Sequence, residues 1–210
     1  MKNNTLSEYS SLEQAYQFFD VQLFDGRLPD CLIVLQRAAN AAGYFVENRY
    51  SGRETKEHTH ELALNPDAFL GRTDKEILST LVHEQAHLWQ CRFGNPSRAG
   101  YHNREWAEKM EALGLMPSDT GAAGGKRTGQ RMTHYIIPGG RFDTATRELL
   151  DSGFKLNWES SRNAAHANGI SKLKFTCPLC RQNAWAKPGA RLLCGHCVVA
   201  MVGGGEGVAT

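Results

Sequence analysis

Residues 73–94 constrain the fold most, because both ends of a helix can be read from them. Thr73 and Glu76 have the spacing of a capping box, in which the threonine accepts from first-turn amides and the glutamate reaches back. Gly94 predicts the end of the helix. Between these signals the apolar residues recur at helical spacing: Ile77, Leu78, Leu81, Val82, Ala86, Leu88 and Trp89. The segment therefore predicts a buried helix.

This helix contains the pentad His83-Glu84-Gln85-Ala86-His87. Two histidines four residues apart project from one helical face, where they can share a tetrahedral zinc ion. Glu84 follows the first histidine directly, so its carboxylate can take a proton from a water molecule in the open zinc position. The pentad predicts zinc-dependent hydrolysis, with His83 and His87 as ligands and Glu84 as the general base.

A catalytic zinc normally takes three protein ligands, so the pentad needs one more. His102 is our prediction, because it lies fifteen residues beyond His87, after a turn and before a second helical stretch. Glu105 and Glu108 are rivals, although a solvated helix face explains them better. Cys91 could also approach the metal, but a buried free thiol is the favoured interpretation.

The segments around these residues resemble the SprT-like family of zincin metalloproteases. The resemblance covers roughly residues 11–115, and its matching stretches are residues 24–29, 61–66, 81–90 and 100–106. It implies that His83, His87 and His102 bind a catalytic zinc and that Glu84 is the catalytic base. It also implies a protein substrate, since the family's eukaryotic member Spartan degrades proteins trapped covalently on DNA. Tyr101 and Asn103 flank His102 where the family usually has glycines.

The expected fold class is α+β, a small zincin-like domain in which the zinc helix packs across a sheet. Its predicted elements are a helix over 11–24 and strands over 31–36, 43–50 and 61–65. The resemblance to zincins implies an edge strand that holds the substrate backbone beside the zinc, and residues 61–65 are our candidate. His58 and His60 are expected to be solvated in the preceding loop.

A second metal site is predicted from two CxxC pairs separated by thirteen residues, Cys177/Cys180 and Cys194/Cys197. Four thiolates complete a zinc tetrahedron, so this C-terminal zinc ribbon should hold a structural ion. Disulfides and a thioredoxin-like redox motif are weaker explanations, because the chain looks cytosolic and reduced. His196 is expected to lie in the knuckle without binding the metal.

Four regions follow from these motifs. They are the zincin domain over 1–117, a linker and intermediate segment over 118–170, the zinc ribbon over 171–202 and a disordered tail over 203–210. Within the second region, residues 118–128 have the composition of a flexible connector, 132–138 predict a strand and 144–150 a short helix.

His134 and Tyr135 lie in a stretch, residues 129–135, that resembles one found in family members. Two interpretations remain for these side chains. They could approach the active site and polarise a carbonyl group, or they could simply pack in a strand, which is the favoured interpretation.

Charge is distributed unevenly along the chain. Residues 1–120 hold 12 basic and 17 acidic side chains, a balance of −5, whereas residues 121–210 hold 12 and 5, a balance of +7. A basic half around a zinc ribbon would suit contact with single-stranded or double-stranded DNA. No signal segment or membrane-length apolar run is visible, so we expect a cytoplasmic protein, including one associated with the nucleoid, and no membrane partner.

Two classes of function are therefore in contention. The first is a zinc endopeptidase that acts on DNA-associated proteins. The second is a nucleic-acid or transcription-associated adaptor without enzymatic activity, in which both zinc ions only hold the fold. Glu84 favours the enzyme, because a purely structural site has no use for a carboxylate beside an open coordination position.

Overall fold

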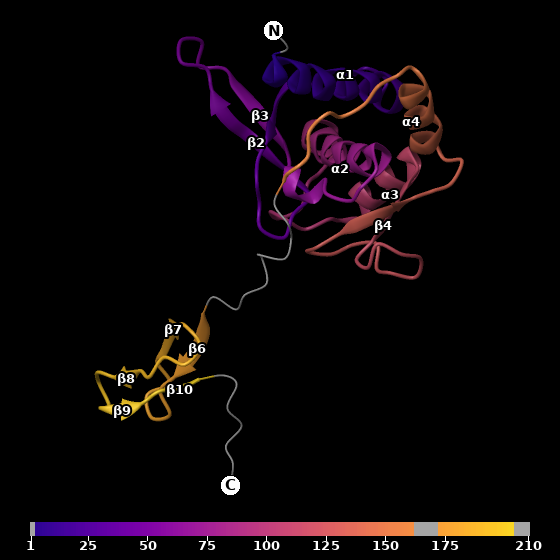
Figure 1. The fold of residues 1–210 in the computed structure, drawn as a ribbon. Coiled ribbons are helices and arrows are strands. Elements are labelled where there is room, and N and C mark those ends of the chain that lie inside the picture. Colours follow the sequence, from indigo (N-terminus) through magenta and orange to yellow (C-terminus); the bar gives the residue numbers. More distant parts are fainter. Residues whose placement is uncertain (1–2, 162–171, 204–210) are drawn as a thin grey trace. The chain divides into compact units, whose positions relative to one another are not determined.

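The computed structural model describes residues 3–161 and 172–203, and it divides the chain into two compact units, Met1–Ser161 and Arg162–Thr210 (Figure 1). The first unit mixes helices and strands, so the predicted α+β class is confirmed. Its elements are α1 (Asn4–Phe24), β1 (Cys31–Leu35), β2 (Gly43–Ser51), β3 (His58–Leu64), the 3-10 turn η1 (Pro66–Ala68), α2 (Asp74–Phe93), α3 (Arg104–Leu113), β4 (Leu115–Ser118), β5 (Thr133–Ile136) and α4 (Arg141–Asp151).

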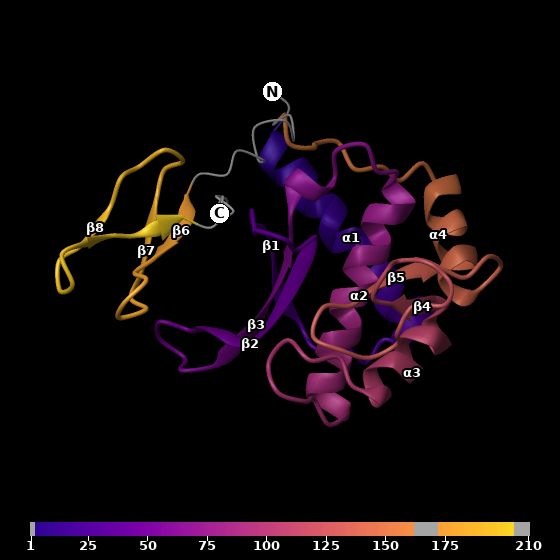
Figure 2. The ribbon, with the colours of Figure 1, turned by 90° about the horizontal axis from the view of Figure 1, so that it is seen from below.

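The main sheet has the strand order β1-β3-β2, with β1 parallel and β2 antiparallel to β3 (Figure 2). The prediction that residues 61–65 form an edge strand is therefore wrong, because β3 lies between the other two strands. Leu62, Ala63 and Leu64 are all buried, as expected for a strand covered on both faces. The strand also starts earlier than predicted, so that His58 and His60 belong to β3 and not to the loop before it.

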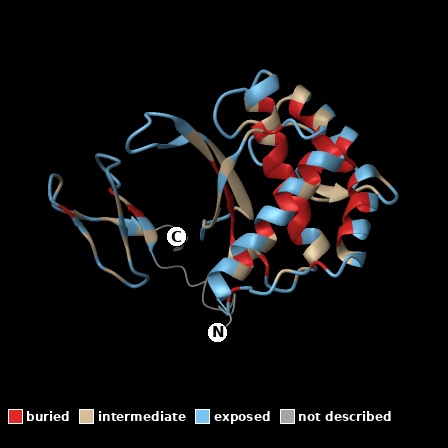
Figure 3. Ribbon diagram, turned by 90° about the horizontal axis from the view of Figure 1, so that it is seen from above, coloured by how far each residue is buried: buried red, intermediate tan, exposed pale blue. Residues whose placement is uncertain are grey.

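Helix α2 occupies the centre of the first unit and packs against β2 and β3 as well as the other three helices. The capping box of Thr73 and Glu76 is present, and the helix ends at Gly94, so this element is confirmed. Buried residues line the sides of the helices that face one another, with exposed residues outside them (Figure 3). No helix in the described ranges is long and apolar enough to cross a membrane.

Helix α1 begins seven residues earlier than the sequence predicted, at Asn4 instead of residue 11. The side chain of Asn3 accepts a hydrogen bond from the amide of Leu6 and caps the helix. Glu8 then provides a buried polar contact, because its carboxylate accepts from the backbone amide of Asn157 at 3.2 Å. The first turns of α1 are thus tied to residues far along the chain, which local sequence could not indicate.

Residues 118–161, which we had assigned to a linker and an intermediate segment, lie in the first unit. Strands β4 and β5 pair antiparallel, with Leu115 opposite Ile136 and Ser118 opposite Thr133. Helix α4 packs against α1. The glycine-rich residues predicted as a connector form the hairpin loop between these strands. Backbone hydrogen bonding between Asp119 and Lys126, with N to O at 3.0 Å, closes this loop. Residues 162–170 of the predicted linker lie outside the described residues.

The second unit is built from short strands: β6 (Leu173–Thr176), β7 (Asn183–Ala186), β8 (Leu193–Cys194), β9 (Val199–Ala200) and β10 (Val202–Gly203). They form one sheet in the order β10-β6-β7 and one β8-β9 pair. Among its described residues, the buried apolar side chains are Phe175, Cys177 and Cys194. This core is small for an independent unit. Of the predicted disordered tail, Gly203 lies in β10 and residues 204–210 lie outside the described part.

Candidate active site

Three histidines converge between helices α2 and α3. His83 and His87 come from α2, and His102 lies two residues before the start of α3. One ring nitrogen of each lies within 4.8 Å of the others, and the Nε2 atoms of His87 and His102 are 3.1 Å apart. Two nitrogens bound to one tetrahedral zinc would be about 3.3 Å apart. These residues therefore fit a metal ion held by three imidazoles.

The rival ligands have other partners. The carboxylate of Glu105 accepts hydrogen bonds from the side chain of Gln90 and the amide of Asn95, both at 2.7 Å. Glu108 is exposed and pairs with Arg104 at 2.7 Å, four residues earlier on the same helix. Cys91 is partly buried and free. None of the three rivals belongs to the histidine cluster among the described residues.

The indole of Trp106 forms a wall behind all three imidazoles. Its ring centroid lies 4.9 Å from that of His83, 5.2 Å from that of His87 and 4.4 Å from that of His102. Trp106 is fully buried, and its Nε1 has no hydrogen-bond partner in the described part of the chain. In the sequence, Trp106 lies in the helical stretch that follows His102, and no local pattern distinguishes it from an ordinary core residue. Its contact with the ligands depends on how α3 packs against α2.

The environment of the cluster favours neutral imidazoles. Burial lowers the pKa of His83 well below its usual value, and the neighbouring histidines lower it further. Burial, with a contribution from His102, lowers the pKa of His87 to about 3. Burial also lowers the pKa of His102, although the carbonyl of Gly129 opposes that shift. Neutral imidazole is the form that binds a metal, so the three rings are prepared for an ion at neutral pH.

Glu84 lies beside this cluster as a buried carboxyl group with a cleft in front of it. No hydrogen bond to its carboxylate is present among the described residues, and burial raises its pKa to about 8. The positive charge of a bound ion would act in the opposite direction and favour the carboxylate. Gly43 of β2 makes room for this group, because a Cβ atom there would lie 3.0 Å from Oε1 of Glu84.

A cleft of about 660 Å³ opens in front of the three histidines and Glu84. One wall is the loop and start of β2 over residues 39–45, and the other is the segment over residues 130–134. In the described ranges β2 pairs only with β3, so its other edge is free along this wall. The edge strand that lines the cleft is therefore β2, and the prediction that residues 61–65 would take this place is wrong.

The segment over residues 129–134 also touches two of the three histidines. The backbones of His102 and Gly129 exchange both hydrogen bonds, and Nδ1 of His102 lies 3.2 Å from the Gly129 carbonyl oxygen. Since a carbonyl can only accept, Nδ1 of His102 carries the proton and Nε2 is free to bind a metal. On strand β5, Nδ1 of His134 lies 3.1 Å from Nδ1 of His83.

His134 thus combines features of both interpretations made from the sequence. The predicted strand is present, and the ring also lines the cleft. Burial, with a contribution from Arg72, lowers the pKa of His134 to about 4, so the ring is neutral at neutral pH. Both of its nitrogens have partners, because Nε2 lies 2.8 Å from the hydroxyl of Ser79. A role in polarising a substrate carbonyl is therefore not supported.

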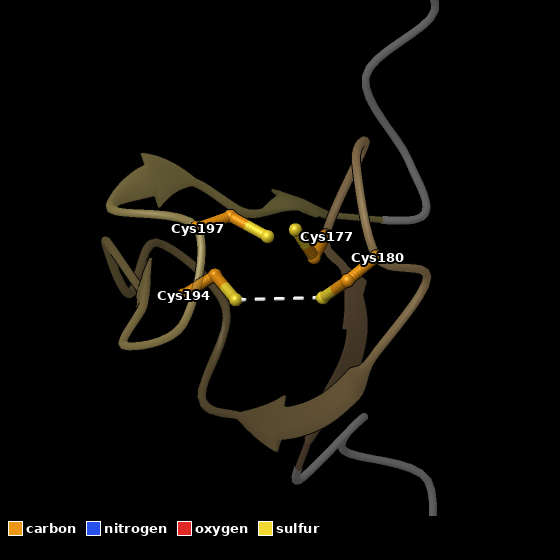
Figure 4. A group of neighbouring side chains, drawn as sticks. All are labelled: Cys177, Cys180, Cys194 and Cys197. Atoms are coloured by element: carbon orange, nitrogen blue, oxygen red, sulfur yellow. Dashed lines mark hydrogen bonds between the residues drawn. The ribbon is translucent and has the colours of Figure 1, made fainter.

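The four cysteines of the second unit point toward a common centre (Figure 4). Their sulfur atoms lie within 4.8 Å of one another, and those of Cys180 and Cys194 are 3.6 Å apart, close to the roughly 3.8 Å between two thiolates on one tetrahedral zinc. The backbone amides of Cys180 and Leu179 lower the pKa of the Cys177 thiol to about 6, which favours a thiolate ligand. All six cysteines are free, and the exposed His196 is not in the cluster.

The profile of the SprT-like family matches residues 12–127, which is more than half of the 210-residue chain. The chain belongs to the SprT-like family. This confirms the resemblance that the residues around His83, His87 and His102 indicated.

An uncharacterized protein in the mucB 3' region of Salmonella typhimurium is 45% identical to the chain over 51 residues, which are 24% of this chain and 69% of that protein. No solved structure gave a significant match to the chain. The SprT-like family suggests a metallopeptidase, and the three-histidine cluster is consistent with a metal site of that kind.

Proposed function

We propose that the chain is a zinc-dependent endopeptidase that acts on DNA-associated proteins, such as proteins crosslinked to DNA. The observation that carries this proposal is the buried Glu84 carboxyl group, which lies without a hydrogen-bond partner among the described residues beside three metal-ready histidines. A purely structural metal site would have no use for such a group. Burying it costs free energy, which is typical of a functional site.

In this proposal His83, His87 and His102 hold the ion, and Glu84 handles protons. A bound zinc ion would lower the pKa of a water molecule and polarise the substrate carbonyl. Glu84 would take a proton from a water molecule in the cleft and deliver it to the leaving amine. Glu84 suits both steps because its carboxyl group is buried, lines the cleft and has no hydrogen-bond partner among the described residues, so it can accept a proton and then donate it.

The free edge of β2 is the proposed position of the substrate backbone. Residues 43–45 line the cleft and pair with β3 on one side only within the described chain. An extended peptide could add to this edge through main-chain hydrogen bonds, which recognise any sequence. Such recognition would suit a protease that meets many different proteins.

The second unit supplies the proposed DNA contact. Residues 172–203 contain five basic side chains and no acidic one: Lys172, Lys174, Arg181, Lys187 and Arg191. Trp185 on β7 is 61% exposed and lies directly opposite Lys174 of β6. An exposed indole beside a cation can stack on an unpaired base while the cation meets the phosphate backbone. These features favour single-stranded DNA.

The test compares wild type with Glu84→Gln, each loaded with zinc to the same measured content. The substrate is a basic protein crosslinked to an oligonucleotide, offered with and without added single-stranded DNA. We expect cleavage by wild type alone, and faster cleavage when the DNA is present. Equal cleavage by both proteins would overturn the role of Glu84. If neither cleaves but both bind DNA, the adaptor function takes the place of the peptidase.

The DNA contact needs a separate variant. Trp185→Ala should weaken binding to single-stranded DNA by about 5-fold to 150-fold, since stacking contributes about 1–3 kcal/mol per base. Cleavage of a free, unfolded protein substrate should stay at the wild-type rate. Unchanged DNA affinity in Trp185→Ala would remove this part of the proposal and leave the peptidase intact.

A further inference from the structure

His134 has a contact that the proposed peptidase mechanism does not use. Its ring lies on β5, 51 residues along the chain from His83, with the two ring centroids 5.3 Å apart and the two Nδ1 atoms 3.1 Å apart. We propose that His134 is a positioning residue that accepts the Nδ1 proton of His83 and thereby fixes the tautomer in which Nε2 of His83 keeps its lone pair for a metal. The inference rests on the proposed function only in taking His83 as a metal ligand.

The direction of this hydrogen bond follows from the groups behind His134. The hydroxyl of Ser79 donates to the carbonyl oxygen of Glu76 at 2.7 Å, so its single proton is already engaged. Nε2 of His134, 2.8 Å from that hydroxyl, must then be the donor. A neutral imidazole has one N–H group, which leaves Nδ1 of His134 as an acceptor.

The same reasoning assigns the proton on His83. An acceptor at Nδ1 of His134 requires a donor opposite, so Nδ1 of His83 carries its proton and Nε2 keeps its lone pair. The reverse direction would put the proton on Nε2 of His83, where it would block metal binding. The chain of hydrogen bonds from Glu76 through Ser79 and His134 to His83 therefore selects the tautomer that can bind an ion.

In this arrangement the segment over residues 129–134 provides a hydrogen-bond acceptor to each of two histidines of the cluster. The Gly129 carbonyl fixes the tautomer of His102, and His134 fixes that of His83. Metal-binding histidines commonly donate their second N–H to a carboxylate or a carbonyl. A neutral imidazole in that place orients His83 without adding negative charge beside the ion. His134 is not itself in the ligand cluster, because its nitrogens are engaged elsewhere.

The experiment measures zinc affinity by competition with a chelator in wild type and three variants of the full chain. His134→Asn keeps an acceptor near the position of Nδ1, His134→Leu has almost the shape of asparagine without an acceptor, and His134→Phe keeps the ring. We expect the leucine and phenylalanine variants to lose about 10–100-fold in affinity for the three-histidine site. Asparagine should restore most of that loss.

Two further measurements separate positioning from simple packing. Nitrogen NMR of the zinc-loaded protein should show His83 protonated at Nδ1 in wild type and His134→Asn. Tyr135→Phe, a change on the same strand, should leave affinity and spectrum unchanged. If leucine and asparagine variants bind zinc equally well, or if His83 is protonated at Nε2, the inference is wrong.

These readouts do not depend on proteolysis. A wild type that fails to cleave any protein but shows the expected affinity series would overturn the proposed peptidase and leave the role of His134 standing. If the wild type cleaves proteins but its zinc affinity is unchanged by substitutions at residue 134, the role of His134 is overturned and the proposed peptidase stands.

Discussion

At the scale of single residues, Gly43 leaves almost no room for a side chain beside Glu84. A Cβ atom at residue 43 would lie 2.8 Å from the carbonyl oxygen of Ala63, 3.0 Å from Oε1 of Glu84 and 3.0 Å from Cγ2 of Thr80. The backbone oxygen in the sheet cannot move easily, whereas the Glu84 side chain can. A larger residue at position 43 would therefore displace the carboxylate.

We accordingly predict that Gly43→Ala keeps the zinc content and lowers the cleavage rate about 100-fold, the effect of misplacing a catalytic group by about 1 Å. Overpacking should also destabilise the fold by about 1–3 kcal/mol. Cleavage assays and urea unfolding measure the two effects. Adding Thr80→Ser, which removes one of the close contacts, should recover part of both losses. Wild-type turnover in Gly43→Ala would contradict this account of the site.

The clustering of the three histidines was predictable because their signals are local, whereas the residues that contact them were not. His83 and His87 follow from helical spacing, and His102 from ligand chemistry and position. The contact between His134 and His83 joins β5, which pairs with β4, to α2, 51 residues earlier in the chain. No pattern within a short window records that pairing. Trp106 was missed as a wall of the site for the same reason, since its apolar periodicity looks like that of any core residue.

At the scale of elements, helix α4 is joined to α2 through a buried carboxylate. Asp143 forms an ion pair with Lys75 of α2 and accepts a hydrogen bond from the Gly139 amide at 2.8 Å. The hydrogen bonds from Lys75 and Gly139 hold the pKa of Asp143 below its usual value. This connection ties residues 139–151, which lie beyond the sequence motifs of the site, to the helix that carries the pentad.

From this contact we predict that Asp143→Asn lowers the free energy of unfolding by about 1–3 kcal/mol at pH 7. Because the pKa is lower in the folded state, the unfolded chain takes up the proton first as the pH falls. The advantage of wild type should therefore shrink below about pH 4, near the ordinary pKa of aspartate. Urea unfolding at pH 7 and pH 3 measures it. Glu148→Gln, exposed on the same helix, should change stability by less than about 0.5 kcal/mol. If the difference in the free energy of unfolding between wild type and Asp143→Asn grows toward low pH, the predicted direction of the pH dependence is wrong.

The order of strands marks the limit of prediction at this scale. The existence of β1, β2, β3 and α2 could be read from apolar patterns and turn residues. The neighbours of each strand could not, because the chain inserts β3 between two strands that precede it. One sign was present in the sequence, since the unbroken apolar run Leu62-Ala63-Leu64 is typical of a strand covered on both faces.

At the scale of the whole molecule, the two units differ in what stabilises them. The first has an extensive core of buried apolar side chains, whereas in the described part of the second these are Phe175 and two of the four clustered cysteines. Metal binding by four thiolates contributes about 10–16 kcal/mol in comparable small domains. We therefore expect the stability of the second unit to depend on an ion bound by the four cysteines, and the stability of the first unit not to depend on that ion.

We predict that Cys177→Ser unfolds the second unit and leaves the first folded. Amide hydrogen exchange should show protection lost over residues 172–203 and retained in α2, while thermal unfolding of the first unit stays within a few degrees of wild type. Cys91→Ser, which changes a cysteine outside both clusters, is the matched control. Retained protection in the cysteine cluster after the substitution would show that packing alone suffices there.

The hairpin of β4 and β5 has a consequence for where a working fragment of this family member can end. The family profile stops at residue 127, after all three imidazoles and Glu84 but before Gly129 and His134. A fragment cut at that point would carry every ligand and lose both acceptors that set the ligands' protons. The family profile therefore ends before the two residues that we propose fix the tautomers of His102 and His83.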